Sequence, residues 1–575
     1  MNVHVFATDY DGTIAEGNRV AEPTARALER VRATGRKLLL VTGRMLPDLH
    51  AVCPEVDRMF DAVVAENGAV VYFPERRELR VQGDAPEPVL IEALERRGVP
   101  FSVGSAIIAT DAPFAEAALD AIRETGVERA LVFNKGALML LPGGVTKATG
   151  VMAALAALQL SPRNMAGIGD AENDHAFLAI CECAVAVADA VPALRERADH
   201  VTRAPAAAGV VEFVEEHLLR DLVDIVPRLA RHRLPLGETA DGTPVTVPAH
   251  GTPLLIVGPS GSGKSTLTGV LAERVLEAGR SVVVIDPEGD YRTLAELEDV
   301  VVFGGKGEQA LPSPDELDQL VRHPRTSLVL DLSAMGRAEK VTYAATVLAV
   351  VAAVRSATGL PHWLIIDEAH HVLPAEGSPG VELVRPGAEA VALITLDAAT
   401  LAPGVQPLPS LVASTEAAAF RAGVRTVLAA RGRGAGTVHL EGPALERGEA
   451  ALAWIDDGLR VARFRIGKRR VQHRRHVRKY TEGELPPDRS FFFRGPAGAL
   501  NLRAANLARF VELAEGVDEA TWAHHLGRGD YSEWVRRMIK DPELADEIAA
   551  VERTDPTPAE SRRQVLERVR ARYAV

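Results

Sequence analysis

Two aspartates separated by one residue follow a short apolar segment at the start of the chain. Asp9 and Asp11 flank Tyr10 and come directly after residues 3–7. Two carboxylates at a strand end repel each other unless a cation such as Mg²⁺ neutralises them, and that cation also attracts a phosphate group. Asp9 could then attack phosphorus, while Asp11 protonates the leaving oxygen and later activates water. The alternative is an aspartate cap at a strand-to-turn junction with no chemistry.

Three further polar segments follow in an order that suits the same chemistry. Thr42 follows an apolar run and offers a hydroxyl to phosphate oxygens, and Lys147 opens an apolar helix as a cation where charge develops. Asp170 and Asp174 follow another apolar run and would complete the metal cradle. With the first pair, these residues predict Mg²⁺ held by four aspartates and a phosphate group held by Thr42 and Lys147.

A glycine-rich segment at residues 258–266 is the second feature that predicts chemistry. It fits the pattern GxxxxGK[ST] and lies between an apolar run and a helical segment. In such a loop backbone N–H groups surround the β-phosphate of a nucleotide, Lys264 neutralises the β and γ oxygens, and the Ser265 hydroxyl binds Mg²⁺. The alternative is a glycine-rich turn that binds no ligand. We expect ATP as the ligand, bound by Gly258, Ser260, Gly261, Ser262, Gly263, Lys264, Ser265 and Thr266.

An acidic pair, Asp367 and Glu368, follows the apolar residues 364–366. An aspartate at this place can hold Mg²⁺, and the adjacent glutamate can polarise the attacking water, which distinguishes a hydrolase from a protein that only binds nucleotide. His370 and His371 come next and superficially suggest a DEAH helicase, but no set of helicase motifs accompanies them. We predict that both histidines begin a helix and do not bind metal.

The elements that must position these residues form two alternating series of short apolar runs and helical segments. This alternation predicts parallel sheets covered by helices, the α/β class. Each run ends where a polar segment begins, at the edge where such sheets bind ligands. Residues 82–147 interrupt the first series with a smaller α+β pattern, helices at 88–97 and 113–125 and strands at 101–109 and 130–141, which we interpret as an inserted cap. The first series has predicted strands at residues 3–7, 38–42, 62–65 and 165–169.

The second series begins after a proline-rich stretch at residues 218–250, where Asp241 and Gly242 predict the turn of a small hairpin in a linker. After residue 479, helical periodicity predicts a small helical tail. The expected domains are residues 1–217 with the cap at 82–147, the linker and hairpin at 218–250, a P-loop domain at 251–479 and a helical domain at 480–575. The strands predicted for the second series are 254–257, 281–285, 300–303, 327–330, 362–366, 392–395 and 426–429.

Residues 1–217 resemble the haloacid dehalogenase (HAD) superfamily phosphatases with a type IIB cap, which include Cof-type sugar phosphatases and archaeal-type phosphoglycolate phosphatase. The resemblance rests on the four polar segments in their order along the chain. It implies a Rossmann-like core, Asp9 as nucleophile, Asp11 as acid and base, Thr42 and Lys147 on the phosphate, and Asp170 and Asp174 at the Mg²⁺ site. The inserted cap then favours a small phosphorylated metabolite such as a sugar phosphate or phosphoglycolate.

Residues 236–466 resemble the HerA/FtsK-type ring ATPases. The resemblance rests on the hairpin before the glycine-rich loop, on residues 285–291, on the Asp367 and Glu368 pair, and on residues 446–450. It implies a RecA-like P-loop fold and a homo-oligomeric, hexameric motor that could act on DNA. One departure is that Leu396 and Asp397 stand where this family usually carries a polar sensor such as Gln after a strand.

Composition and charge exclude several classes of protein. The 575 residues are 47% hydrophobic and 25% charged, as in folded globular proteins, and three cysteines exclude a disulfide framework and suit a reducing cytoplasm. No export signal precedes Asp9, and the longest apolar run, residues 341–354, is too short to cross a bilayer, so we predict a buried helix and no membrane partner. Cys181 and Cys183 have no neighbouring metal ligands and are expected to be buried thiols.

Charge is distributed unevenly along the chain. The net charge is −13, and residues 1–217 hold 21 basic and 31 acidic residues, whereas residues 460–479 hold ten basic residues and no acidic one. Contact with nucleic acid is therefore disfavoured for the first segment and open for the rest. The basic stretch could contact phosphates or could form a solvated strand edge and linker. Arg431 and Arg433 could likewise reach a neighbour's nucleotide or lie in a solvated loop.

These patterns together predict a bifunctional cytoplasmic enzyme, a Mg²⁺-dependent phosphatase fused to an Mg²⁺-dependent ATPase. Two alternatives remain for the second half of the chain. It could sense nucleotide or promote oligomerisation and regulate the phosphatase, or it could be a DNA-translocating motor to which the phosphatase is accessory.

Overall fold

The computed structural model comprises two units, residues 1–470 and 471–575. Each unit is described by itself. The structure describes residues 3–134, 136–229, 232–305, 309–376, 379–384, 390–434, 444–469, 485–496, 500–539, 541–554 and 557–573.

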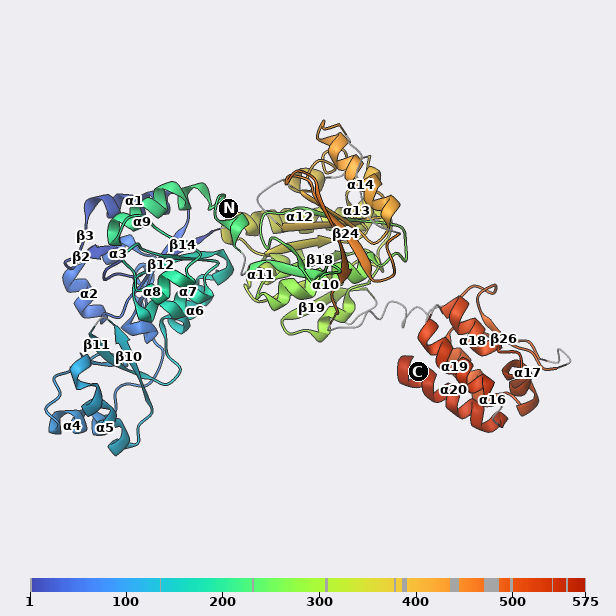
Figure 1. The fold of residues 1–575 in the computed structure, drawn as a ribbon, viewed down its shortest axis with the longest axis horizontal. Helices are drawn as coiled ribbons and strands as arrows, with labels where there is room; N and C mark the ends of the chain where they lie inside the picture. Colours follow the sequence, from blue (N-terminus) through green and yellow to red (C-terminus); the bar gives the residue numbers. More distant parts are fainter. Residues whose placement is uncertain are drawn as a thin grey trace. The chain divides into compact units, whose positions relative to one another are not determined.

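The first domain is built on an eight-stranded sheet in the order β14-β13-β12-β1-β4-β5-β6-β7. The strands from β14 to β5 are parallel, and β6 and β7 extend the sheet as antiparallel strands. The central strands are apolar and fully buried because helices cover both faces (Figure 1). The four strands predicted in this region are present. The bounds are β1 Val5–Thr8, β4 Lys37–Val41, β5 Ala62–Ala65, β6 Val70–Phe73, β7 Glu78–Val81, β12 Met165–Gly169, β13 Cys183–Ala186 and β14 His200–Val201.

Five helices of this core are α1 Glu22–Ala33, α2 Leu46–Val52, α6 Lys147–Leu158, α7 His175–Ile180 and α9 Ala206–Glu216. Cys53, Cys181 and Cys183 are all buried and form no disulfide, which confirms the prediction of buried thiols for Cys181 and Cys183. The sheet and its helices therefore place the ends of β1, β4 and β12 at one shared edge, where the predicted site residues follow.

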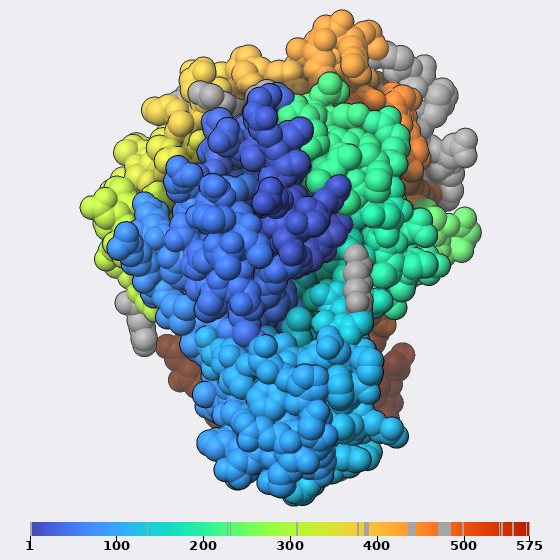
Figure 2. Space-filling view, turned by 90° about the vertical axis from the view of Figure 1, so that its left-hand side faces the viewer, coloured from blue at the N-terminus to red at the C-terminus, as the bar shows by residue number. Residues whose placement is uncertain are grey.

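The predicted cap is a four-stranded antiparallel sheet in the order β10-β11-β9-β8, and it forms a lobe below the core in Figure 2. Its helices are α4 Pro88–Arg96 and α5 Ala115–Thr125, which pack on one face of this sheet. Each of the two expected strands is divided in two, and the second division falls at a turn that contains Gly136 with a φ of +92°. The strands are β8 Ser102–Val103, β9 Ile108–Asp111, β10 Arg129–Asn134 and β11 Ala137–Pro142.

The second domain is an eleven-stranded sheet in the order β16-β15-β25-β24-β23-β17-β22-β21-β18-β20-β19. The strands from β23 to β19 are parallel, and the expected hairpin, β15 with β16, joins the sheet through β25. The bounds are β15 Leu234–Glu238, β16 Pro244–Val247, β17 Leu254–Val257, β18 Val282–Asp286, β19 Val300–Gly304, β20 Ser327–Asp331, β21 Trp363–Ile366, β22 Ala390–Thr395, β23 Leu411–Ser414, β24 Glu449–Trp454 and β25 Arg460–Ile466.

The strand predicted at residues 426–429 is wrong, because these residues lie in α14 Ala417–Ala430. Phe420, Val424 and Val427 are buried on one face of this helix, at helical and not strand spacing. The short apolar run alone could not distinguish the two. The sheet gains instead β23, β24 and β25, which the sequence pattern did not reveal.

The apolar run at residues 341–354 lies in α12 Arg337–Thr358, beside α11 Pro314–Arg322. Among the described residues, α12 is long and apolar enough to cross a membrane by length and composition. Core helices of globular domains pass the same test, and Ala344, Val347 and Val351 pack into the core of the second domain. This packing agrees with the predicted buried helix.

The two domains of the first unit meet through buried polar groups. The carboxylate of Glu182, before β13, accepts from Arg280 Nη2 at 2.6 Å and contacts His250 Nε2 at 2.8 Å. His362 Nε2 lies 3.1 Å from the Ser161 hydroxyl. Burial opposes the ionisation of Glu182, but the charges of His250 and Arg280 outweigh it and hold the pKa of this carboxyl well below its usual range. We call Ser161, Glu182, His250, Arg280 and His362 the polar junction.

The polar junction lies at the amino ends of strands in both sheets. Ser161 and Glu182 precede β12 and β13, and Arg280 and His362 precede β18 and β21. Parallel strands share one carboxyl edge, so the ligand-binding edges of both sheets lie at the ends opposite the polar junction. The two predicted sites therefore face away from each other.

The C-terminal unit is helical, as predicted, with a short hairpin of β26 Phe491–Phe493 and β27 Leu502–Ala504. Its core is aromatic, with Trp522 stacked on Tyr531 at a centroid distance of 4.2 Å. In the other unit, the described part of the basic stretch contains β25 and Arg469, whose Nε donates to Glu273 at 2.9 Å. Residues 470–479 lie outside the described residues. The helices are α16 Leu507–Gly516, α17 Glu519–Leu526, α18 Asp530–Trp534, α19 Pro542–Arg553 and α20 Pro558–Tyr573.

Candidate functional site

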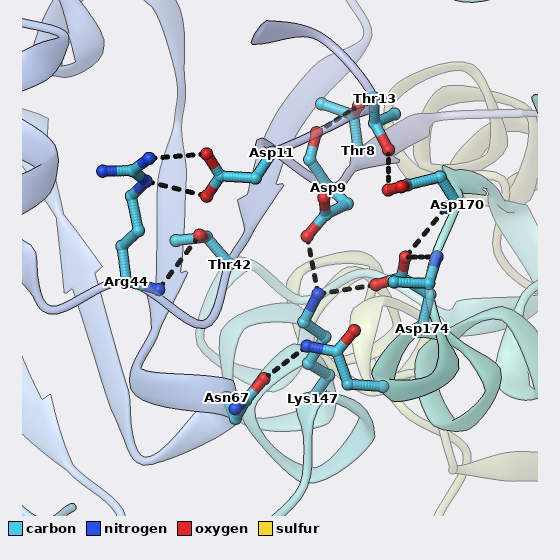
Figure 3. A network of polar contacts seen from close by, with 12 residues as sticks. Thr8, Asp9, Asp11, Thr13, Thr42, Arg44, Asn67, Lys147, Asp170 and Asp174 are labelled. Carbon is cyan, nitrogen blue, oxygen red and sulfur yellow. Dashed lines mark hydrogen bonds and ion pairs between the residues drawn. The ribbon is translucent and has the colours of Figure 1, made fainter. Parts of the chain in front are cut away.

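The paired aspartates lie at the carboxyl end of β1 but in different surroundings. Asp9 is 5% exposed, and its backbone N–H donates to the carbonyl of Ile168 on β12. Asp11 is half-exposed, and Arg44 holds its carboxylate through Nε at 2.7 Å and Nη2 at 2.6 Å. Figure 3 shows Asp11 turned toward Arg44 and Asp9 turned toward Lys147. The two carboxylates therefore point toward different cationic partners and not toward each other.

Lys147 is the first residue of α6 and reaches into the site from the opposite side. The preceding Thr146 caps the helix through the Thr149 N–H, which fixes where α6 begins. Lys147 Nζ donates to Asp9 Oδ1 at 2.6 Å and to Asp174 Oδ1 at 2.5 Å. Burial alone would lower the pKa of Lys147, but Asp174 and Asp9 outweigh it and raise this pKa above its usual range. Lys147 is therefore a fixed cation between two carboxylates.

Asp170 and Asp174 follow β12 and complete a buried acidic cluster. The Thr13 hydroxyl donates to Asp170 Oδ1 at 2.8 Å, and the backbone N–H groups of Asp170 and Ala171 donate to Asp174 Oδ2. Burial raises the pKa of Asp9 well above its usual range, and Asp174 and Asp170 add to this effect while Lys147 opposes it. The cluster thus carries more negative charge than its one lysine balances.

The acidic cluster fits a divalent cation. One oxygen each from Asp9, Asp170 and Asp174 lies within 4.8 Å of the others, and no other such group of three metal-binding side chains occurs among the described residues. Buried carboxylate oxygens are the ligands that Mg²⁺ prefers. The structure brings together three of the four aspartates predicted for this metal, whereas the carboxylate of Asp11 lies on Arg44.

Thr42 lies directly after β4, on the loop that also carries Arg44. Its hydroxyl accepts from the Arg44 N–H at 3.1 Å, and its own N–H donates to the carbonyl of Val64. Arg44 stands two residues after the predicted phosphate ligand, but its residue type and position alone predict no role for it. The ion pair with Asp11 could be found only in the folded chain, because 33 residues separate the two partners.

The turn between β5 and β6 is a second part of the site that was not predicted from the sequence. Glu66, Asn67 and Gly68 all have positive φ, of +51°, +52° and +101°. The Glu66 side chain, 1% exposed, accepts from the N–H groups of Ser105 and Ala106 in the cap. The only signal in the sequence is the Asn-Gly pair, which predicts a tight hairpin turn and no site.

The glycine-rich loop joins β17 to α10 Lys264–Glu277, as its pattern predicts. Gly263 precedes the helix with a φ of +105°, and Lys264 is the first helical residue. Lys264 Nζ donates to the carbonyls of Gly258 and Pro259 at 2.8 and 3.2 Å, so its ammonium lies over the loop. Ser265 is half-buried and Thr266 is exposed. Ser260 and Gly261 are exposed along the same loop, and Ser262 is half-buried.

Asp367 and Glu368 directly follow β21, on the same sheet edge as the glycine-rich loop. Burial raises the pKa of Asp367 well above its usual range, and Asp286 and Asp290 add to this shift. Burial also raises the pKa of Asp286 to about 7. Glu368 has a φ of +40°, an uncommon conformation for a residue other than glycine. Several carboxylates thus gather beside the loop.

The two histidines after this acidic pair lie in a helix, as predicted. His370 and His371 are in the short helix α13 Ala369–Val372, which packs near β22. His370 Nδ1 lies 3.5 Å from Glu368 Oε2 and 3.2 Å from the Thr395 hydroxyl. Thr395 is thus the polar residue at the end of β22, and the exposed Leu396 follows it.

The loop that carries Arg431 is held to its own domain. Arg431 Nε donates to the carbonyl of Pro407 at 2.7 Å, and Nη2 donates to that of Pro409 at 2.9 Å. An ion pair with Asp456 completes these contacts. Within the described residues, Arg431 therefore binds a neighbouring loop of the same domain.

Comparison with known proteins identifies the family of the first domain. A family profile described as haloacid dehalogenase-like hydrolase matches residues 6–103 and 102–214. The chain is 30% identical over 222 residues to "Phosphoglycolate phosphatase 2" of Saccharolobus solfataricus, a match that covers 38% of this chain and 93% of that protein. The chain belongs to the haloacid dehalogenase-like hydrolases.

A second relative of this HAD hydrolase is "Phosphoglycolate phosphatase" of Methanothermobacter thermautotrophicus. The two are 31% identical over 226 residues, which cover 38% of this chain and 99% of that protein. A solved haloacid dehalogenase-like hydrolase from Bacteroides thetaiotaomicron is 17% identical, with a TM-score of 0.34, and the match covers 37% of this chain and 99% of the other.

The HAD hydrolase also carries a second type of domain. A family profile described as the central domain of helicase HerA matches residues 236–344, which include the glycine-rich loop. The chain is therefore a fusion of a HAD hydrolase domain with a HerA-like domain.

Proposed function

We propose that the HAD domain is a Mg²⁺-dependent phosphatase that works through a phosphoaspartyl intermediate on Asp9. The observation that carries this proposal is the buried cluster of Asp9, Asp170 and Asp174 around Lys147 at the carboxyl edge of the sheet. Bound Mg²⁺ would neutralise the carboxylates and draw the substrate phosphate toward them.

Each residue of the proposed site has a separate role in the reaction. Asp9 attacks phosphorus, and the hydroxyl of Thr42 and the ammonium of Lys147 bind phosphate oxygens. Asp11 protonates the leaving oxygen and then takes a proton from the water that attacks the phosphoaspartate. Arg44 orients Asp11 by donating to both oxygens of its carboxylate, so one of these hydrogen bonds must be released when that oxygen carries the proton.

We propose a small phosphorylated metabolite as the substrate. The cap reaches the loop after β4, where the Met139 side chain would lie 2.9 Å from a Cβ added to Gly43, next to Thr42. Phosphoglycolate is the first compound to test, since the relatives above carry it in their names. Sugar phosphates are the second class.

The HerA-like domain is proposed to bind and hydrolyse ATP. Lys264, Ser265 and the loop from Gly258 to Thr266 would bind the phosphates and Mg²⁺, while Asp367 would hold Mg²⁺ and Glu368 would polarise water. The loop geometry and the profile match to residues 236–344 support this proposal. Three buried cysteines that form no disulfide favour a cytoplasmic protein.

Two variants test whether the two proposed activities belong to separate sites. Asp9→Asn should lower phosphatase kcat by roughly 10³-fold or more and leave ATP hydrolysis unchanged, because it removes only one nucleophile. Lys264→Ala should do the reverse. Both activities are measured on the full chain with a panel of phosphorylated metabolites. If either variant affects both activities equally, the sites are assigned wrongly.

Stimulation by DNA distinguishes the possible roles of the HerA-like domain. A DNA-translocating hexamer should show faster ATP hydrolysis with DNA and a ring mass in solution. A nucleotide-sensing or oligomerisation module should instead change phosphatase activity when ATP is added, and DNA should not change its rate of ATP hydrolysis. The matched control is Lys264→Ala, which should abolish either response.

A further inference from the structure

The turn formed by residues 66–68 contacts two segments of the proposed phosphatase site, the loop after β4 and the start of α6. The N–H groups of Glu66 and Asn67 donate to the carbonyls of Arg44 and Thr42, on the proposed phosphate loop. Gly68 packs so closely on α6 that an added Cβ would lie 1.9 Å from the carbonyl oxygen of Thr146, next to Lys147. The main chain of the turn is therefore fixed by two catalytic segments.

The side chains of the same turn extend in two other directions. The Glu66 carboxylate binds the N–H groups of Ser105 and Ala106 at 3.0 and 3.1 Å, which attaches the β8 to β9 loop of the cap. The Asn67 amide donates to the thioether of Met139 on β11 and accepts from Asn173 Nδ2 at 2.9 Å. Asn173 immediately precedes Asp174, so one buried amide connects the cap to the acidic cluster.

The backbone of the turn argues for a role beyond packing. Three consecutive residues with positive φ form an unusual conformation, and one of them, Glu66, carries a side chain that such a φ disfavours. Strain of this kind persists where the surrounding structure enforces it and is concentrated at functional sites. Here the strained residue is Glu66, whose side chain holds the cap.

We propose that residues 66–68 are a latch that couples closure of the cap to the ordering of the metal-binding loop, with Asn67 as a positioning residue. The latch rests on the proposed phosphatase function. Cap closure places Met139 on the Asn67 amide, which orients Asn173 and with it Asp174. By reciprocity, Mg²⁺ bound at the acidic cluster favours the closed cap.

Hydrogen exchange on the full chain tests this coupling without using activity. Addition of Mg²⁺ should slow exchange of the Ser105 and Ala106 amides in the wild type and have no effect in Asn67→Gly, which retains the backbone conformation but lacks the amide. Asp174→Asn is the control that shows whether the effect arises at the acidic cluster. Equal slowing in wild type and Asn67→Gly would overturn the proposal.

Kinetics supply the second measurement, and Met139→Leu is the matched variant because it keeps the volume and removes the thioether acceptor. Asn67→Gly should raise the Mg²⁺ concentration for half-maximal activity several-fold and lower kcat about tenfold, with a smaller change in KM. Met139→Leu should shift the same parameters in the same direction by less. Unchanged Mg²⁺ dependence in both variants would contradict the latch.

A wild type that hydrolyses no phosphate ester would refute the proposed function, and the exchange experiment would still decide whether the latch exists.

Discussion

Lys147 is the residue on which the charge balance of the phosphatase site depends. Among the residues that the structure describes, it is the only cation in contact with both Asp9 and Asp174. Its side chain is 1% exposed. Removal of one partner of a buried ion pair leaves the other charge without compensation. Lys147 thus has a structural role in addition to the catalytic role that we propose.

Lys147→Met should lower the free energy of unfolding by about 3–5 kcal/mol, because the buried carboxylates then repel each other without a counter-charge. Mg²⁺ should restore part of this loss and should stabilise the variant more than the wild type. Thermal unfolding with and without Mg²⁺ measures both effects. A variant with unchanged stability, or one that does not respond to Mg²⁺, would show that the carboxylates are not in electrostatic contact.

At the scale of elements, the edge of the first sheet gathers loops that lie far apart in the chain. β1, β4 and β12 are neighbours, so Asp9, Thr42 and Asp170 follow adjacent strands although up to 161 positions separate them. The turn between β5 and β6 then fills the space between these loops and α6. The positions of these loops relative to α6 therefore depend on the close packing of this turn.

Gly68→Ala should therefore destabilise the protein by about 3 kcal/mol or more, because a positive φ costs roughly 1–2 kcal/mol and the added Cβ also collides with α6. Gly17→Ala is the matched control, since Gly17 also has positive φ, +56°, but a Cβ there would have no neighbour within 4 Å. The control should cost about 1 kcal/mol. Chemical denaturation of both variants gives the comparison, and equal losses would argue against the close contact.

At the scale of the whole molecule, the polar junction joins the HAD and HerA-like domains at their amino-terminal sheet edges. Direct transfer of an intermediate between the two proposed sites is excluded by this arrangement, because each site opens at the opposite edge. Four strands that lead toward the two proposed sites, β12, β13, β18 and β21, have their amino ends at this junction. The buried charges make this interface specific and sensitive to substitution.

Glu182→Ala should lower stability by about 3–5 kcal/mol, because Arg280 then stays buried without its carboxylate partner. We also expect the calorimetric transition of the first unit to broaden or divide as the domains unfold separately. Glu22→Ala, which removes an exposed ion pair with Arg26, is the control and should leave the transition unchanged. A sharp, unshifted transition in Glu182→Ala would mean that the junction adds nothing to domain docking.

Local patterns in the sequence were enough to predict the α/β class, the cap, most strands of both sheets and the fused HerA-like domain. Apolar runs bounded by polar or glycine residues identify buried parallel strands, and the GxxxxGK[ST] spacing identifies its loop without knowledge of distant partners. The same patterns failed at residues 426–429, where a short apolar run is equally consistent with a strand and with one face of a helix.

By itself the sequence determined which residues could do chemistry and the order in which strands present them, because these properties depend on residue type and local periodicity. Only the tertiary structure decided that Arg44 holds Asp11, that Glu66 and Asn67 attach the cap, and that the polar junction separates the two sites. Each of these contacts joins residues that are distant along the chain, and no local spacing encodes which of them meet. Burial then gives the contacts their strength, since charges removed from water depend on the partners that folding provides.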